Sequence, residues 1–334
     1  MILPPKLKTG DQVRIVAPSC TLPSAPWLTD EVLEEGKRFF TDLGMTVTEG
    51  KYLREIDAAG STTIEYRLAD LHDAYADPDV KALLCIRGGW NVNQLLPFLD
   101  YEVIRSTPKI LCGFSDITAL GNAITAKTGV VTYSGPNFNQ FCMGEKLAYA
   151  RTHFLAAVMK DEPITLTAAP EWTDSYFQAG KPWAFEKNEG WWTVHEGEAE
   201  GTCIGGNLCT LSLLQGTDYM PVARDLILFL EDDHETHPRT FDRDFTSLTQ
   251  QPWFERVRGL LIGRFQRTAV NQEFGPVTKE KLLQILARNE ACAGLPIIAN
   301  VDFGHTYPIF TFPIGGTARM SSKAGEPTIV IQRP

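Results

Sequence analysis

The chain has 334 residues, of which 43% are hydrophobic and 22% charged, a composition typical of a globular protein of about two domains. Its 41 acidic and 31 basic residues give a net charge of −10, which disfavours nucleic acid or an anionic membrane as partner, because both require clustered Lys and Arg. The sequence contains no apolar run of membrane-span length and no signal-peptide pattern, so we expect a cytoplasmic protein.

The first half alternates strand-like and helix-like segments. Residues 12–17 and 80–86 are apolar, β-branched runs typical of buried strands, and residues 28–43 carry apolar side chains at helical spacing. A third apolar run at residues 109–114 leads directly into a predicted helix at residues 116–127. This alternation predicts an α/β fold in which helices cover both faces of a mostly parallel sheet, over residues 1–163.

The second half is less regular. Residues 164–185 hold several prolines and no helical period, which predicts a linker. Further strands are expected at residues 191–204, 226–230 and 259–265, so residues 186–334 form a second, mixed α/β domain.

Several cofactor and metal motifs are missing. The sequence contains neither a G-x-G-x-x-G dinucleotide fingerprint nor a P-loop. The acidic stretch 231–237 (EDDHETH) lacks the H-E-x-x-H spacing and follows an apolar strand, which favours a solvated loop over a metal site. Seven scattered cysteines, none spaced C-x-x-C, favour reduced core thiols over disulfides or zinc.

The sharpest catalytic signal is Ser115, between the strand at 109–114 and the helix that follows. A serine at such a junction exposes its hydroxyl at the carboxyl end of a parallel sheet, and the N–H of Asp116 then faces a developing oxyanion. The pattern departs from G-x-S-x-G, because Ile117 occupies the position of the second glycine. Ser115 or Asp116 acting only as a helix cap is the competing interpretation.

A second turn, at Gly88-Gly89, follows another predicted strand of the same sheet. Its glycines permit close backbone approach, so an amide there can complete an oxyanion hole, or the turn simply requires glycine. A serine nucleophile also needs a base and a group that orients the base. His305, which follows a predicted strand, and Glu231, at the end of another, are candidates in a recurrent triad order, although spacing alone does not show that they meet.

Several motifs together resemble the serine LD-carboxypeptidase family, which includes murein tetrapeptide carboxypeptidases and microcin C self-immunity peptidases. The match runs in order from Gly10 to Gly316. The motifs are IRGGWNVNQLLPFLDYEVI (86–104), KILCGFSDITAL (109–120), CIGGNLCTL (203–211), LFLED (228–232), GLLIGRF (259–265) and NVDFGHTYPIFTFPIGG (300–316).

The resemblance implies a triad of Ser115, Glu231 and His305 split across two domains, the second of them β-rich. It also implies oxyanion donors from the amides of Asp116 and the Gly88-Gly89 turn, no metal or other cofactor, and a cytoplasmic homodimer.

Within the family, residues 189–194 (EGWWTV) resemble the tryptophan-bearing loop of the microcin C immunity branch. There a tryptophan stacks on the adenine of an aminoacyl-adenylate-like substrate, which makes Trp191 and Trp192 the candidates. The alternative is that both pack in the interior. Asn207 matches an asparagine that helps to hold the substrate.

These observations predict a metal-independent serine carboxypeptidase acting on a small peptide or aminoacyl-nucleotide substrate. Microcin-C-type peptidyl or aminoacyl adenylates are the first candidate substrates. The alternative is murein tetrapeptide, from which the enzyme releases terminal D-Ala. A ligand-binding module without catalysis is a third hypothesis, which the presence of Ser115, Glu231 and His305 disfavours.

Overall fold

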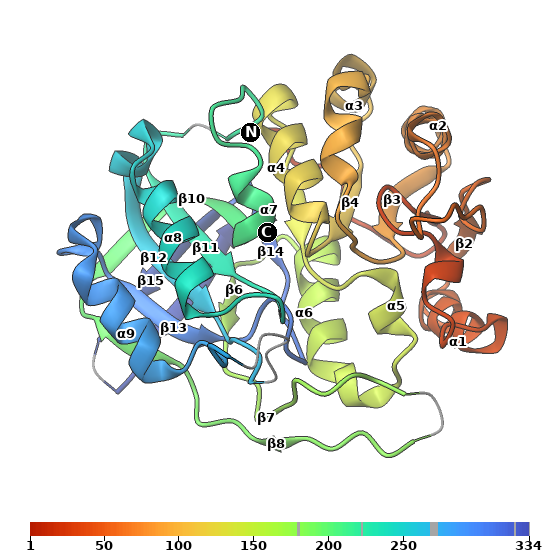
Figure 1. The fold of residues 1–334 in the computed structure, drawn as a ribbon. Helices are drawn as coiled ribbons and strands as arrows, with labels where there is room; N and C mark the ends of the chain where they lie inside the picture. Colours follow the sequence, from red (N-terminus) through yellow and green to blue (C-terminus); the bar gives the residue numbers. More distant parts are fainter. Residues whose placement is uncertain (179–180, 222, 268–272, 324, 334) are drawn as a thin grey trace.

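The computed structural model describes residues 1–178, 181–221, 223–267, 273–323 and 325–333. Two large β-sheets lie side by side, and helices cover them (Figure 1). None of the helices within these ranges is long and apolar enough to span a lipid bilayer.

The first sheet has six strands. They are β1 (Gln12–Val16), β2 (Thr46–Glu49), β3 (Val80–Cys85), β4 (Ile110–Gly113), β5 (Thr132–Ser134) and β14 (Phe312–Ile314). Their order across the sheet is β14-β5-β4-β3-β1-β2, in which β1 to β5 are parallel and β14 is antiparallel to β5. Every residue of β4 and β5 is buried, as expected of strands covered on both faces.

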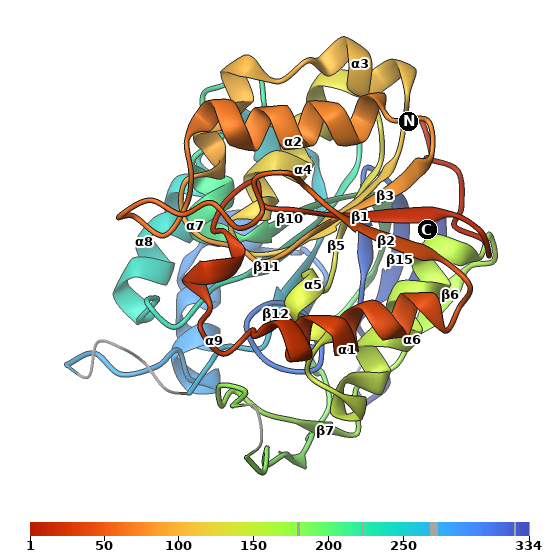
Figure 2. The same ribbon diagram turned by 90° about the vertical axis from the view of Figure 1, so that its right-hand side faces the viewer.

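Helices cover both faces of this sheet. They are α1 (Asp30–Thr41), α2 (Ile64–Ala76), α3 (Tyr101–Ser106), α4 (Ile117–Thr128), α5 (Phe138–Phe141) and α6 (Ala148–Met159), with 3-10 turns η1 (Leu22–Ser24), η2 (Val92–Phe98) and η3 (Glu145–Leu147). α2, α3 and α4 contribute to one hydrophobic cluster, and α1, α5 and α6 to another on the opposite face (Figure 2). The predicted three-layer α/β arrangement is confirmed.

The second sheet has eight strands, in the order β6-β16-β15-β10-β11-β12-β13-β9. Its strands are β6 (Ile164–Leu166), β9 (Trp192–His195), β10 (Glu198–Asn207), β11 (Leu226–Glu231), β12 (Val257–Gly263), β13 (Ile297–Val301), β15 (Thr317–Ser321) and β16 (Thr328–Arg333). β10 to β13 are parallel, and the outer strands are antiparallel. The accompanying helices are α7 (Leu208–Ser212), α8 (Pro238–Thr249) and α9 (Lys279–Arg288), with 3-10 turns η4 (Pro252–Arg256) and η5 (Glu290–Cys292). The β-rich, mixed second unit is thus confirmed.

Two segments differ from the sequence-based expectation. Part of the predicted linker 164–185 is ordered as strands, because β6 pairs with β16, and β7 (Glu171–Trp172) pairs with β8 (Glu186–Lys187). The β-branched residues of β6 and its buried Leu166 explain its place in the sheet. Conversely, β14 lies within the predicted second domain but joins the first sheet, where its Pro313 suits an edge strand. The domain boundaries at residues 163 and 186 remain our proposal.

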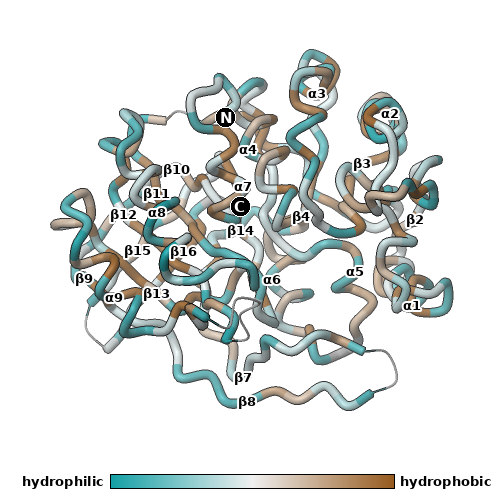
Figure 3. The backbone as a smooth tube through the Cα atoms, viewed as in Figure 1, coloured by the Kyte–Doolittle hydropathy of each residue, from teal (hydrophilic) through white to brown (hydrophobic). Residues whose placement is uncertain are grey.

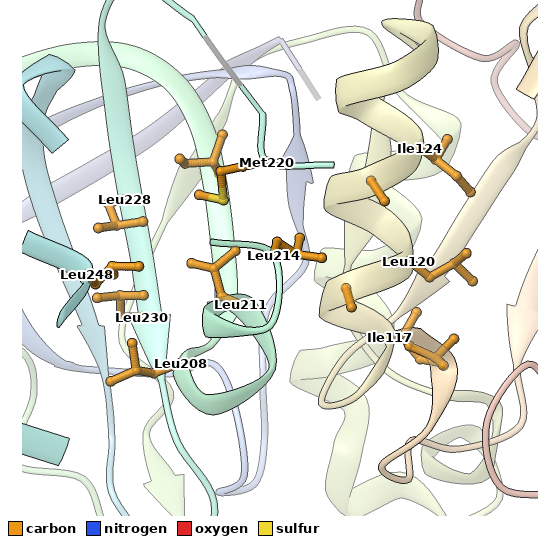
Figure 4. Close-up of a cluster of buried hydrophobic side chains, with 14 of the residues drawn as sticks. Ile117, Leu120, Ile124, Leu208, Leu211, Leu214, Met220, Leu228, Leu230 and Leu248 are labelled. Carbon is orange, nitrogen blue, oxygen red and sulfur yellow. The ribbon is translucent and has the colours of Figure 1, made fainter. Parts of the chain in front are cut away.

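A shared hydrophobic core joins the two sheets through α4 and α7. Ile117, Leu120 and Ile124 lie on α4, and the leucines of α7 lie between α4 and the second sheet (Figure 4). Along the tube in Figure 3, brown hydrophobic stretches lie mostly within the sheets, and teal hydrophilic stretches dominate the outer loops. Asn122 of α4 exchanges two hydrogen bonds with the backbone of Gly205, at 2.9 and 3.2 Å. The middle of α4 is therefore hydrogen-bonded to β10 of the second sheet.

Candidate active site

Ser115 occupies a sharp turn between β4 and α4. Its φ of +66° is unusual, since Ser115 and Asn300 are the two non-glycine residues with positive φ in the described part of the chain. Such strain persists only where the surroundings enforce it, and it is typical of a nucleophile on a strand-to-helix turn. The cap interpretation gains no support, because no side chain caps the first turn of α4.

Three side chains that are far apart in the sequence meet at this turn. His305 Nε2 lies 2.9 Å from Ser115 Oγ, and His305 Nδ1 lies 2.7 Å from Glu231 Oε2. Glu231 ends β11 and its side chain is 2% exposed, whereas that of His305 is 17% exposed. The structure thus brings the predicted triad residues into a continuous hydrogen-bonded chain, with the hydroxyl at one end and a buried carboxylate at the other.

Glycines make room for the carboxylate. Gly304 has a φ of +99°, and a Cβ built there would lie 2.6 Å from the carboxyl carbon of Glu231. A Cβ on Gly263, at the end of β12, would lie 2.6 Å from Glu231 Cβ. Because both positions exclude a side chain, the loop that carries His305 can approach Glu231 closely enough for the short hydrogen bond.

The electrostatics favour a protonated imidazole in this pair. Burial by itself lowers the pKa of His305, but the Glu231 carboxylate outweighs burial and, with Asp233 and Asp232, raises the pKa to about 9. Burial has the opposite effect on a carboxyl group, and it raises the pKa of Asp232 to about 7. Glu231 is therefore placed to stabilise an imidazolium that forms when His305 accepts a proton.

The two predicted oxyanion glycines differ in their surroundings. A Cβ on Gly88 would lie 2.8 Å from Ser115 Cβ and 3.4 Å from the Asp116 nitrogen, so Gly88 packs directly against the candidate nucleophile. The nearest neighbours of Gly89 are instead Ser19 and Cys20. Gly88 and the Asp116 amide thus flank Ser115, and Gly89 lets the turn pack against the loop that follows β1.

Asn207 lies beside the triad. It is the register partner of Glu231 in the β10–β11 pair and is 1% exposed. Its Oδ1 accepts a hydrogen bond from the Thr210 amide at 3.0 Å, and its Nδ2 donates to Asp232 at 3.2 Å. Its side chain therefore connects the start of α7 to the carboxylate that follows Glu231.

Trp191 and Trp192 lie in two different environments. Trp191 donates its indole N–H to the buried carboxylate of Asp302 at 2.8 Å, three residues before His305. Trp192 donates to Glu189 at 3.1 Å, and the Lys279 ammonium lies 4.5 Å from its ring centre. Both side chains are half-buried. Trp191 packs against a hydrophobic cluster of the second sheet, and Trp192 packs against the hydrophobic core that the two sheets share.

Sequence reasoning missed an aromatic cluster close to His305. Tyr307 packs with Trp183 at 5.1 Å between ring centres, and Trp183 in turn contacts Phe177 and Phe185. The concentration of aromatic residues in the segment predicted as a linker was the available signal.

One group in the described part of the chain, formed by Cys209, Asp232 and Asp233, has ligand atoms close enough together for a metal ion. It includes neither histidine of the acidic stretch. Cys209 donates its thiol proton to Asn207 Oδ1 at 2.9 Å, and burial raises the pKa of that thiol. A metal requires the thiolate, so this group is a poor fit for one.

Family models and related sequences both match this chain to carboxypeptidases. Residues 13–135 match the LD-carboxypeptidase N-terminal domain, and residues 200–320 match the LD-carboxypeptidase C-terminal domain. The chain is 45% identical to the Bacillus subtilis carboxypeptidase homologue YocD, over 98% of both chains. It is 32% identical to a Bacillus subtilis protein named as a murein peptide carboxypeptidase, over 98% of this chain and 94% of the relative.

Solved structures of related proteins have the same fold as this chain. An MccF-like protein from Bacillus anthracis matches with a TM-score of 0.94 and 45% identity, over the full length of both chains. The microcin C7 self-immunity protein MccF in complex with aspartyl sulfamoyl adenosine matches with a TM-score of 0.86 and 28% identity, over 100% of this chain and 99% of the other. The chain belongs to the LD-carboxypeptidase family of peptidases.

Proposed function

We propose that the protein is a serine carboxypeptidase that cleaves an amide bond near the C-terminal end of a small peptide-like substrate. The hydrogen-bonded chain Ser115–His305–Glu231, with its 2.9 and 2.7 Å distances, is the observation that carries the proposal. A hydroxyl, an imidazole and a buried carboxylate in this order are the elements of nucleophilic acyl transfer.

In the proposed mechanism, the neutral form of His305 accepts the Ser115 proton at Nε2 as Oγ attacks the scissile carbonyl carbon. The oxyanion accepts hydrogen bonds from the Asp116 amide and from the Gly88 turn. The imidazolium, stabilised by Glu231, then protonates the leaving nitrogen, and the C–N bond breaks to leave an acyl-enzyme. Water, deprotonated by the same imidazole, hydrolyses that ester and regenerates Ser115.

Peptidyl or aminoacyl adenylates of the microcin C type are the substrates we favour. The TM-score of 0.94 to an MccF-like structure supports this choice, as does the aspartyl sulfamoyl adenosine bound by MccF itself. Trp191 or Trp192 would stack on the base, and Asn207 would help to hold the substrate. Murein tetrapeptide, losing its terminal D-Ala, is the second candidate, supported by the relative named as a murein peptide carboxypeptidase. We further propose that the enzyme works in the cytoplasm as a homodimer without a metal.

Parallel incubation with murein tetrapeptide and with an aspartyl sulfamoyl adenosine tests the proposal, with mass spectrometry to identify products. Release of aspartate from the adenosine compound supports the adenylate branch, and release of D-Ala supports the murein branch. The Ser115→Ala variant is the matched control, because it keeps the binding surface and removes the nucleophile. Binding of either compound without hydrolysis by the wild type would favour the non-catalytic binding module.

A further inference from the structure

A buried carboxylate lies next to the proposed oxyanion hole, where a negative charge has no evident use in the reaction. Asp116 is 1% exposed, and its Oδ2 accepts three hydrogen bonds. Ser19 Oγ donates at 2.5 Å, and the backbone amides of Asn91 and Val92 each donate at 2.9 Å. Three donors on one oxygen give this side chain a fixed position.

The three donors come from two loops at the same edge of the first sheet. Ser19 follows β1. Asn91 ends the turn that begins after β3 and contains Gly88, and Val92 is the first residue of η2. The Cys20 amide also donates to the Gly88 carbonyl at 3.3 Å. The Asp116 carboxylate therefore connects the residue after Ser115 to the turn that packs against Ser115 from the other side.

A buried cation reinforces the same turn. Arg67 is 2% exposed, and its Nη1 donates to the carbonyl and to the side-chain oxygen of Asn91, at 3.1 and 3.0 Å. The same nitrogen donates to the Pro18 carbonyl at 3.1 Å, in the loop that carries Ser19. Arg67 thus balances the charge of Asp116 within the loops that both residues hold.

From this arrangement we infer that Asp116 is a positioning residue that holds both walls of the oxyanion hole. The backbone amide of Asp116 is one hydrogen-bond donor to the oxyanion. Its carboxylate fixes the turn so that Gly88 faces the same oxyanion position beside Ser115. The inference rests on the proposed function, because it assigns the Gly88 turn and the Asp116 amide to oxyanion binding. Removing the carboxylate should therefore weaken transition-state binding and leave ground-state binding largely intact.

Steady-state kinetics of three variants test this inference on whichever substrate the wild type hydrolyses. Asp116→Ala should lower kcat by about 10²- to 10³-fold, as loss of an oxyanion donor does, with KM within about threefold. Asp116→Asn should recover at least about tenfold of that loss, because its amide oxygen still accepts from the Asn91 and Val92 amides. Ser19→Ala removes one of the three donors and should lower kcat about three- to tenfold with KM unchanged.

The outcomes separate the inference from the proposed function. A wild-type protein that hydrolyses neither substrate overturns both. An active wild type with Asp116→Ala at near wild-type kcat, or with a loss confined to KM, overturns the inference alone. Should Asp116→Ala fail to fold in a thermal melt, Ser19→Ala decides, since kcat equal to that of the wild type contradicts the proposed positioning.

Discussion

From the pairing of His305 with Glu231 we predict the pKa of His305 and how far it falls when the carboxylate is removed. The carboxylate raises the imidazole pKa from its ordinary 6.5 to about 9, against the effect of burial. At about 1.4 kcal/mol per pKa unit, this rise corresponds to roughly 3 kcal/mol of preferential stabilisation of the protonated form. Changing Glu231 to Gln removes the charge, so burial prevails and the pKa of His305 should fall to 6.5 or below.

The rate at which a fluorophosphonate labels Ser115 measures this pKa, because the labelling step requires neutral His305. We expect the wild-type rate to rise with pH up to a midpoint near 9, and the midpoint in Glu231→Gln to lie at least about two units lower. Asp233→Asn is the matched control, since Asp233 raises the pKa of His305 less than Glu231 does, and it should shift the midpoint by less. A wild-type midpoint near 6.5, or equal midpoints in the wild type and Glu231→Gln, would refute the reasoning.

Protein stability gives an independent check with a defined sign. Because folding raises the pKa of His305, the ion pair contributes fully to the unfolding free energy below pH 6.5. That contribution should be lost as pH rises through about 9, and this loss should be absent in Glu231→Gln. Urea unfolding at pH 6 and at pH 9.5 measures the difference for each protein.

Two further predictions concern the metal and the base. EDTA should leave hydrolysis unchanged, since His305 activates the nucleophile, and a loss that zinc restores would instead implicate the acidic stretch 231–237. If Trp191 or Trp192 stacks on adenine, its change to Ala should lower kcat/KM for an adenylate by roughly 5- to 150-fold, equivalent to about 1–3 kcal/mol, and spare the tetrapeptide. Equal losses on both substrates would contradict base stacking.

The strand ends that carry the candidate site were predictable from the sequence. Continuous apolar runs mark β3, β4 and β11 as buried strands, and polar residues directly after such runs emerge at the carboxyl edge of a parallel sheet. The positions of Ser115 and Glu231 follow from this rule alone.

The meeting of the triad was not predictable from residue patterns alone. His305 is 190 residues from Ser115 and 74 from Glu231, and their contact depends on how the two sheets pack through α4 and α7. The hydrogen bonds to the Asp116 carboxylate were not predictable for another reason, since two of the three donors are backbone amides, which every residue type except proline supplies. Strands as short as β6 and β14 carry too few residues to show a period, so residue patterns did not reveal them.

Covalent labelling tests the central claim, that Ser115 is the nucleophile, most directly. The wild-type protein, treated with a fluorophosphonate at pH 9, should gain the mass of one phosphonyl group, and peptide mapping should place it on Ser115. Ser115→Ala should remain unlabelled and should melt near the wild-type temperature, because the change removes only one half-buried hydroxyl and no packed apolar group. A wild type that stays unlabelled, or equal labelling of Ser115→Ala, would contradict the account.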